Sequence, residues 1–138
     1  GVCLVGDISS GGQSWNLLSK SKLGGVVYFE LLGLKRDRAQ MALEAFLSWI
    51  ERIKPHDNLS PGVSPHAPYS VRIELLNFAI EQELPLQMHL AETLLELELI
   101  KTRKGSFADW LIAKNVYDES GMVPSMRNIL QVVMAETV

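Results

Sequence analysis

The chain has 138 residues, of which 47% are hydrophobic and 21% charged, and a formal net charge of −3 at pH 7. This composition is typical of one soluble globular domain, and no cluster of Lys and Arg indicates a nucleic-acid-binding surface. No apolar run reaches the roughly 18 residues that predict a membrane span. The single cysteine, Cys3, excludes an internal disulfide and is compatible with the cytoplasmic location that we expect.

Both ends of the chain lie in or beside predicted elements. The chain begins with Gly1 rather than Met, and residues 2–8 already predict a buried strand. Residues 128–138 lie inside or just after a helical pattern. We therefore expect residues 1–138 to form a truncated piece of a larger domain.

The hydrophobic pattern predicts strands that alternate with helices. Short apolar strands are predicted over residues 2–8, 26–34, 58–66 and 84–90. Helices are predicted over residues 14–23, 37–53, 73–80, 93–102, 106–117 and 126–137. Asp37 is the predicted N-cap of the second helix, with Gln40 three residues on. The buried face of the third is predicted to consist of Leu75, Leu76, Ala79 and Ile80.

Strands and helices in this order predict an α/β domain with a parallel sheet and right-handed crossovers. About four consecutive β/α units fit either a partial (β/α)8 barrel or part of an open doubly wound sheet. No G-x-G-x-x-G follows a predicted strand, and there is no P-loop. The nucleotide-binding form of the open sheet therefore lacks support.

Polar residues occur near the ends of the predicted strands: Asp7, Glu30, His66 and His89. Catalytic groups of parallel α/β domains collect at the carboxyl ends of the strands, so we expect His66 and His89 to open onto the same rim. Glu92 follows His89 by three residues. A metal-bound water needs a neutral imidazole on the metal and a nearby carboxylate for its proton, and His-x-x-Glu can supply both groups.

Each of these residues also has a structural interpretation. A single His at a strand end is more often a hydrogen-bonded structural residue than a ligand. Asp7 would then cap the following turn, Glu30 would be paired within the sheet, and Glu92 would be a helix N-terminal charge favoured by the dipole.

Other conspicuous residues are expected to be structural or solvated. His56 is expected in a solvated loop, and the Leu-Glu alternation of residues 94–100 is expected to separate a solvated helix face from a core face. Core packing is expected for Trp15, Trp49 and Trp110.

The motifs "PHAPYSV" (residues 65–71) and "MHLAET" (residues 88–93), in this order and spacing, resemble the amidohydrolase superfamily in its deaminase and chlorohydrolase branch. The opening "GVCLVGDIS" and the later "VVYFELLGL" resemble two of its strands. The resemblance extends to about Thr93, and more loosely to Tyr117. It implies a metal-dependent (β/α)8 barrel that hydrolyses C–N or C–Cl bonds on nitrogen-containing rings.

By matching position, the resemblance implies that His89 is a ligand of a divalent metal, with zinc expected. It implies that Glu92 is the acid/base that takes a proton from the metal-bound water, and that His66 contacts the substrate; the role of Tyr69 is left open. We expect a small N-heterocyclic substrate of the adenosine or S-adenosylhomocysteine type, and neither a nucleic-acid nor a membrane partner.

The chain departs from the family pattern in its ligand set. It contains no H-x-H, and its histidines are His56, His66 and His89. Catalytic metal sites use about three protein ligands, so we expect the isolated chain to be inactive. Arg72 and Ile73 stand where the family often has Ser-Pro, which weakens the helix start by about 1 kcal/mol.

Two other functions remain open. Half-barrels expose strand edges, so a non-catalytic α/β half-barrel that self-associates, for example as a homodimer, is one alternative. The other is a metal-free enzyme that uses His66 or His89 as general base.

Overall fold

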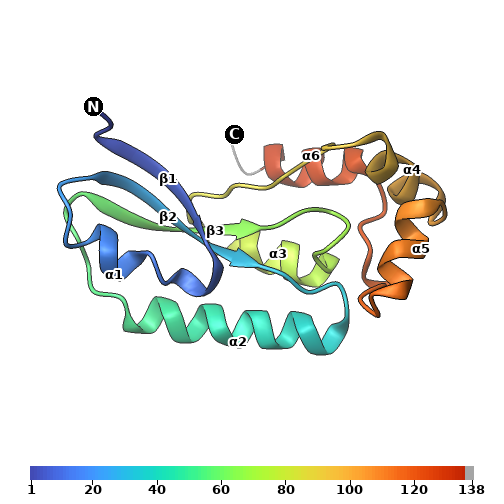
Figure 1. Ribbon diagram of the computed structural model, residues 1–138, viewed down its shortest axis with the longest axis horizontal. Helices are drawn as coiled ribbons and strands as arrows, with labels where there is room; N and C mark the ends of the chain where they lie inside the picture. The colour runs from blue at the N-terminus through green and yellow to red at the C-terminus, as the bar shows by residue number, and fades with distance from the viewer. Residues whose placement is uncertain (136–138) are drawn as a thin grey trace.

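The structure is a computed structural model that describes residues 1–135, with side chains as far as Gln131. A parallel sheet of three strands in the order β1-β2-β3 forms its centre (Figure 1). The strands are β1 (Leu4–Ser9), β2 (Gly24–Leu31) and β3 (Leu59–Pro65). The α-helices are α1 (Trp15–Leu18), α2 (Arg36–Arg52), α3 (Ile73–Glu81), α4 (Leu94–Thr102), α5 (Ser106–Ala113) and α6 (Met126–Ala135), and two short 3-10 turns span Ser10–Gly12 and Glu119–Gly121.

The two faces of the sheet have different surroundings. Side chains alternate along a strand, and the ring of Phe29 in β2 packs against Phe46 and Trp49 of α2 at centroid distances of 5.6 and 5.3 Å. Glu30 therefore points to the face away from α2, and Ser64 of β3 shares that face because the two residues are in register. His66 follows Ser64 by two residues and directly succeeds the end of β3. The chain thus delivers His66 to the carboxyl end of the sheet.

The helices largely follow the predicted patterns, but α1 is shorter than the predicted residues 14–23, α5 ends at Ala113 rather than at residue 117, and the cap of α2 differs. The predicted core face of α3 is confirmed, since Leu75, Leu76, Ala79 and Ile80 are all buried. The predicted cap of α2 is wrong: Lys35 is the N-cap residue, and it makes no side-chain cap bond. Asp37 lies inside the first turn, where its negative charge still complements the helix dipole. Of the predicted last helix, residues 136 and 137 lie outside the described residues.

The predicted fourth strand over residues 84–90 is not formed. This segment runs beside β3 and makes one isolated parallel bridge, between Val63 and Leu86. Val63 N donates to Pro85 O at 2.9 Å, and Gln87 N donates to Val63 O at 3.2 Å. Pro85 has no N–H to give to a ladder, and within the described residues no further strand pairs with the segment. The sheet described therefore has three strands rather than the predicted four.

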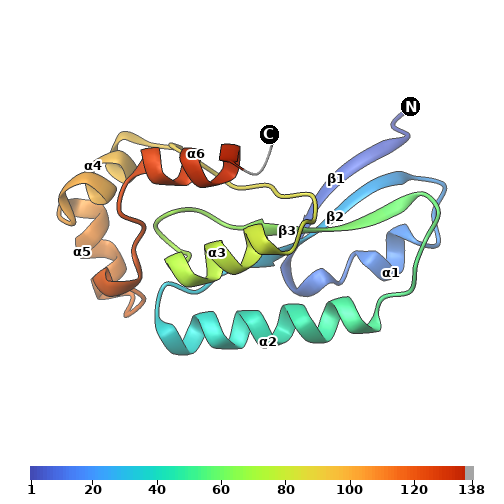
Figure 2. The same ribbon diagram turned by 180° about the vertical axis from the view of Figure 1, so that it is seen from behind.

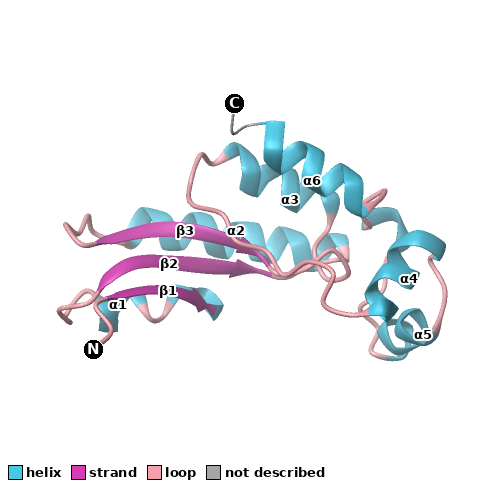
Figure 3. Ribbon diagram, turned by 90° about the horizontal axis from the view of Figure 1, so that it is seen from above, coloured by secondary structure: helices cyan, strands magenta, loops and turns pink. Residues whose placement is uncertain are grey.

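Helices α4 and α5 gather beyond the carboxyl end of the sheet, and α2 runs along one face (Figures 1 and 2). The view from above separates the three strands from the helical end of the molecule (Figure 3). In the part of the chain that the structure describes, no helix is long and apolar enough to cross a membrane. The carboxyl end of the sheet is thus the place where loops and helices can enclose a site.

Candidate functional site

His66 and His89 meet at the carboxyl end of β3. Their ring centroids are 5.2 Å apart with an interplanar angle of 72°. The backbone N–H of His89 donates to the carbonyl oxygen of His66 at 2.9 Å. This bond continues the pairing of residues 84–90 with β3. Although these residues do not form a strand, they bring both imidazoles to one rim of the sheet, as the sequence predicts.

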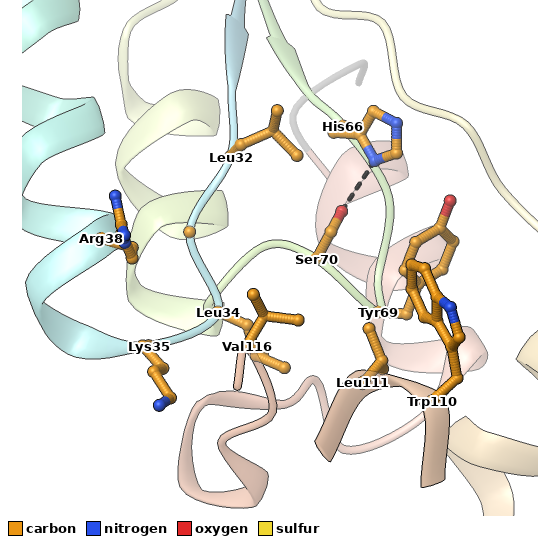
Figure 4. A pocket seen from close by; sticks show the side chains of 11 residues that line it. Leu32, Leu34, Lys35, Arg38, His66, Tyr69, Ser70, Trp110, Leu111 and Val116 are labelled. Atoms are coloured by element: carbon orange, nitrogen blue, oxygen red, sulfur yellow. Dashed lines mark hydrogen bonds between the residues drawn. The ribbon is translucent and has the colours of Figure 1, made fainter. Parts of the chain in front are cut away.

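The orientation of the His66 ring depends on Ser70. The Nδ1 atom lies 2.7 Å from Ser70 Oγ (Figure 4), and the Ser70 hydroxyl donates to Ala67 O at 3.1 Å. Because that hydroxyl proton is already engaged, Ser70 Oγ accepts from Nδ1–H. The Nε2 atom of the neutral imidazole is then left without a proton and can accept a hydrogen bond. Ser70 was not predicted as a site residue, and the signal for it is its place four residues after His66 in the same turn.

Glu92 belongs to the same cluster through Tyr69. The Tyr69 hydroxyl donates to Glu92 Oε2 at 3.0 Å, and its ring lies edge-on to His66 at a centroid distance of 5.7 Å. Burial, the hydrogen bond to Glu92 and the charge of Glu92 together raise the pKa of Tyr69 to about 12. Tyr69 therefore stays protonated at neutral pH and holds an otherwise exposed carboxylate beside the histidines.

The Glu96 carboxylate holds the turn that carries Glu92 through hydrogen bonds to its backbone. Glu96 is fully buried, and its carboxylate accepts from Glu92 N at 2.8 Å and from Ala91 N at 3.4 Å. Thr93 Oγ1 accepts from Glu96 N at 3.1 Å, a reciprocal arrangement close to a capping box. Burial raises the pKa of Glu96. The prediction that the Glu residues of α4 form a solvated face is thus wrong for Glu96. Its carboxylate is buried because the N–H groups of the turn before α4 need an acceptor, whereas Leu94 is 82% exposed.

Three other candidate residues lie outside the cluster. Asp7 accepts a hydrogen bond from Ser14 Oγ, which matches its interpretation as a turn residue. His56 precedes β3, at the opposite end of the strand from His66, and its Nε2 lies 3.1 Å from Ser19 O. Glu30 is half-buried, and within the described residues it has no ion pair.

The residues present do not fit a complete metal site. Over residues 1–135, no group of three His, Cys, Asp or Glu side chains is placed to hold a metal ion. His89 and His66 are neighbours, but Glu92 is bonded to Tyr69, and structural or catalytic zinc requires three or four donors converging on one point.

A pocket of about 510 Å³ opens beside His66. Its lining is mostly apolar: Leu32, Gly33, Leu34, Lys35, Arg38, His66, Tyr69, Ser70, Trp110, Leu111 and Val116 (Figure 4). The prediction of core packing is confirmed for Trp15 and Trp49, which are 4% and 5% exposed. It is wrong for Trp110, which is 52% exposed and forms part of the pocket wall.

Arg72, the N-cap residue of α3, bonds to Leu34 of the pocket wall and to Asp118, which follows the wall residue Val116 by two positions. Its side chain is 3% exposed, Nε lies 3.0 Å from Glu74 Oε2, and Nη1 donates to Asp118 Oδ2 at 2.7 Å and to Leu34 O at 3.1 Å. Nη2 donates to Ser120 Oγ at 3.2 Å. Hydrogen bonds from Ser120 and Arg72 hold the pKa of Asp118 below its ordinary value. The expected loss of a cap at this position is confirmed, but the buried charge pair was not predicted, because Asp118 is 46 residues away.

Known deaminases resemble the chain in sequence. No family model matches it. Aminodeoxyfutalosine deaminase from Deinococcus radiodurans is 35% identical over 99 residues, which are 67% of this chain and 24% of that protein. Adenosine deaminase from Helicobacter pylori is 33% identical over 116 residues, which are 80% of this chain and 28% of that protein.

Solved structures give the same result. A crystal structure of Helicobacter pylori aminofutalosine deaminase matches with a TM-score of 0.78 and 25% identity, covering 96% of this chain and 34% of that one. The same enzyme in complex with methylthio-coformycin matches with a TM-score of 0.68 and 29% identity. The chain thus spans about a quarter to a third of the length of these relatives. The resemblance carried by the two histidine motifs is confirmed: the chain is homologous to one part of the deaminases of the amidohydrolase family.

Proposed function

We propose that this chain is part of a metal-dependent deaminase that hydrolyses the exocyclic C–N bond of a nucleoside-type, N-heterocyclic substrate. The supporting observation is that His66 and His89 meet at the carboxyl end of β3 and that Tyr69 links Glu92 to this end, which is the end where barrels of this type carry out chemistry. The named relatives are deaminases, which favours C–N over C–Cl bonds. We also propose that the three strands belong to a (β/α)8 barrel.

Each of the three residues has a role in this proposal. His66 accepts a hydrogen bond from the substrate at its free Nε2, since Nδ1 is engaged by Ser70. Glu92 transfers a proton to or from the reacting ring, and its position is fixed by Tyr69 at the carboxylate and by Glu96 at the backbone. His89 is a metal ligand. The other ligands must come from polypeptide beyond these 138 residues, because the described residues hold no complete set.

A chimera tests the proposal directly. The matching third of Helicobacter pylori aminofutalosine deaminase would be replaced by this chain, and ammonia release would be measured. We expect activity, and we expect Glu92→Gln and His89→Ala each to lower it at least about 100-fold, the range of general acid–base contributions. His56→Ala is the matched control and should leave the rate unchanged. A folded chimera whose activity is unaffected by Glu92→Gln would overturn the proposal.

The isolated chain should be inactive. With zinc and adenosine present, the purified 138-residue protein is expected to release no ammonia above the buffer rate and to bind no stoichiometric zinc in calorimetry. Turnover without metal that disappears in His66→Ala or His89→Ala would instead establish the metal-free general-base enzyme.

Self-association is a second candidate function, supported by the exposed edge of β1. In the part of the chain that the structure describes, β1 pairs with β2 alone, and Val2 and Leu4 are 74% and 72% exposed. An open apolar edge is a template for pairing with another strand. Sedimentation equilibrium tests this candidate. A concentration-dependent dimer that dissociates in the Leu4→Lys variant would support self-association, and a folded monomer would exclude it.

A further inference from the structure

A second pocket, of about 580 Å³, lies between residues 11–19 and residues 49–56. It shares no lining residue with the pocket beside His66. One of its lining residues, His56, precedes β3, whereas His66 follows that strand. The pocket is therefore distinct from the candidate site, and its volume is within the usual range of small-molecule sites.

Two tryptophans and a glycine form the buried wall of this pocket. Trp15 and Trp49 meet edge-on at a centroid distance of 6.0 Å, and both are buried. Trp49 Nε1 donates to Gly12 O at 3.2 Å. Gly12 has a φ of 68°, and a Cβ atom on it would lie 2.2 Å from Trp49 Nε1, so a glycine is required for this close approach. Packing against the core thus fixes the shape of the wall.

The imidazole of His56 joins the two sides of the pocket. Its Nε2 lies 3.1 Å from Ser19 O, and the backbone N–H of Asn58 donates to Nδ1 at 3.2 Å. Because a carbonyl oxygen can only accept, Nε2 carries the proton. Both ring nitrogens therefore have partners within the protein, and His56 takes no part in recognising a ligand.

The charged side chains that line the pocket are cations. Arg52 and Lys54 line it together with the amides of Gln13 and Asn16, and among the described residues no Asp or Glu does, although the whole chain carries a net charge of −3. Arg52 Nε donates to Ser48 O at 2.8 Å, which orients the guanidinium and leaves its two Nη groups for a ligand. Within the part of the chain that the structure describes, neither cation has an ion-pair partner.

This arrangement favours an anionic ligand. A concave surface with charges of one sign raises the local concentration of the opposite charge. A guanidinium pairs with both oxygens of a carboxylate or phosphate at once, and an ammonium group adds a point charge. The side-chain amides can bond to the hydroxyl groups of the same molecule.

We infer that this pocket binds a small polyhydroxylated molecule that carries an oxyanion, either a phosphate or a carboxylate group. Arg52 and Lys54 hold the oxyanion, and Gln13 and Asn16 bond to the hydroxyl groups. The inference does not rest on the proposed function, because no residue of the candidate site takes part.

A matched series of sugars tests the inference. Glucose is neutral, gluconate carries a carboxylate and glucose 6-phosphate carries a phosphate, all on six carbons. Binding to the 138-residue chain would be measured by NMR titration at low ionic strength, because salt screens exposed charges. We expect at least one of the two anions to bind about tenfold more tightly than glucose, the range of one charge-assisted hydrogen bond, and the comparison of the two identifies the preferred oxyanion. Arg52→Gln and Lys54→Gln should each remove most of this difference.

Lys101→Gln is the matched control. It removes one positive charge from an exposed residue outside the pocket, so the affinity for the anions should be unchanged. Circular dichroism checks that each variant is folded. Equal affinity for glucose and both anions, or no binding of any of the three, would overturn the inference. An equal loss of affinity in Lys101→Gln would show that net charge rather than the pocket attracts the anion, which would also overturn it.

Discussion

At the scale of single residues, the turn after β3 organises the candidate site. Ser70 engages Nδ1 of His66 and leaves Nε2 free, and Tyr69 places a hydroxyl on Glu92. Both residues belong to the "PHAPYSV" motif, so one short segment orients an imidazole and a carboxylate that are 26 positions apart in the chain. Side chains fixed by such hydrogen bonds are pre-organised, which is what proton transfer at a defined atom requires.

Tyr69 should produce a measurable alkaline transition. Its pKa is raised from the ordinary value of 10.0 to about 12 in the folded chain, so the unfolded state loses the proton first as the pH rises. The contribution of Tyr69 to stability is therefore complete below pH 10.0 and is lost as the pH approaches 12. Urea unfolding across this window should show a steeper fall in the free energy of unfolding for wild type than for Tyr69→Phe. Parallel curves would contradict the assignment.

At the scale of elements, the start of α4 determines where Glu92 lies. The Thr93–Glu96 pair satisfies N–H groups that a helix start otherwise leaves without partners, and Ala91 adopts a left-handed conformation with φ of 56°, which is unfavourable for a residue with a Cβ. The bonds from Glu96 to the backbone of residues 91 and 92 offset this strain. The start of α4 is therefore stabilised by the buried side chain of Glu96 rather than by the helix propensity of its residues.

Glu96 variants test this view of α4. Glu96→Ala should lower the free energy of unfolding by about 1–3 kcal/mol, the cost of leaving buried donors unsatisfied, whereas Glu96→Gln keeps an acceptor and should cost less. Because burial raises the folded pKa of Glu96 above 4.5, wild-type stability falls relative to Glu96→Gln as the pH rises through that folded pKa. Equal effects of Ala and Gln in urea denaturation would show that the carboxylate bonds are not stabilising.

At the scale of the whole molecule, Arg72 connects the sheet end to the later segment that closes the pocket. One guanidinium joins the loop after β2, at Leu34 O, to Asp118 and Ser120 near Glu119–Gly121. Glu74 also faces this guanidinium, with Oε2 3.0 Å from Arg72 Nε, so the loss of Asp118 removes one of the two carboxylates that compensate the buried charge. The position of Val116, and with it the pocket wall, depends on this connection.

Breaking the pair should be destabilising. Asp118→Asn is expected to lower the free energy of unfolding by about 1–3 kcal/mol, because Glu74 still compensates part of the Arg72 charge, and the double variant Arg72→Met with Asp118→Asn should cost less than the sum of the single changes. The exposed hydrogen bond that Gln40 Nε2 donates to Glu44 Oε1 on α2, 2.8 Å long, is the control: Gln40→Ala should cost under about 1 kcal/mol. Additive effects of the Arg72 and Asp118 changes in chemical denaturation would refute the coupling.

Local sequence patterns predicted much of the fold and of the candidate site. The apolar spacing of residues 75–80 predicts the buried face of α3, and the paired motifs around His66 and His89 predict both the deaminase relationship and the meeting of the two imidazoles. These predictions succeed because helix periodicity, strand alternation and direct succession along the chain are short-range properties. A strand that ends at Pro65 must deliver the next residue, His66, to the edge of the sheet.

By itself, then, the sequence determined the order of the helices and of the three strands, the rim that holds His66 and His89, and the family relationship. The tertiary structure alone decided that residues 84–90 form no strand, that Glu96 is buried while Trp110 is exposed, and that Arg72 meets Asp118. Each of these outcomes depends on what lies beside a residue rather than on its own type. Pro85 gives residues 84–90 no N–H for a ladder at that position, and these residues make one isolated bridge to β3. The N–H groups of residues 91 and 92 bond to the buried carboxylate of Glu96. The indole of Trp110, 41 residues after Tyr69, forms part of a pocket wall and is half exposed.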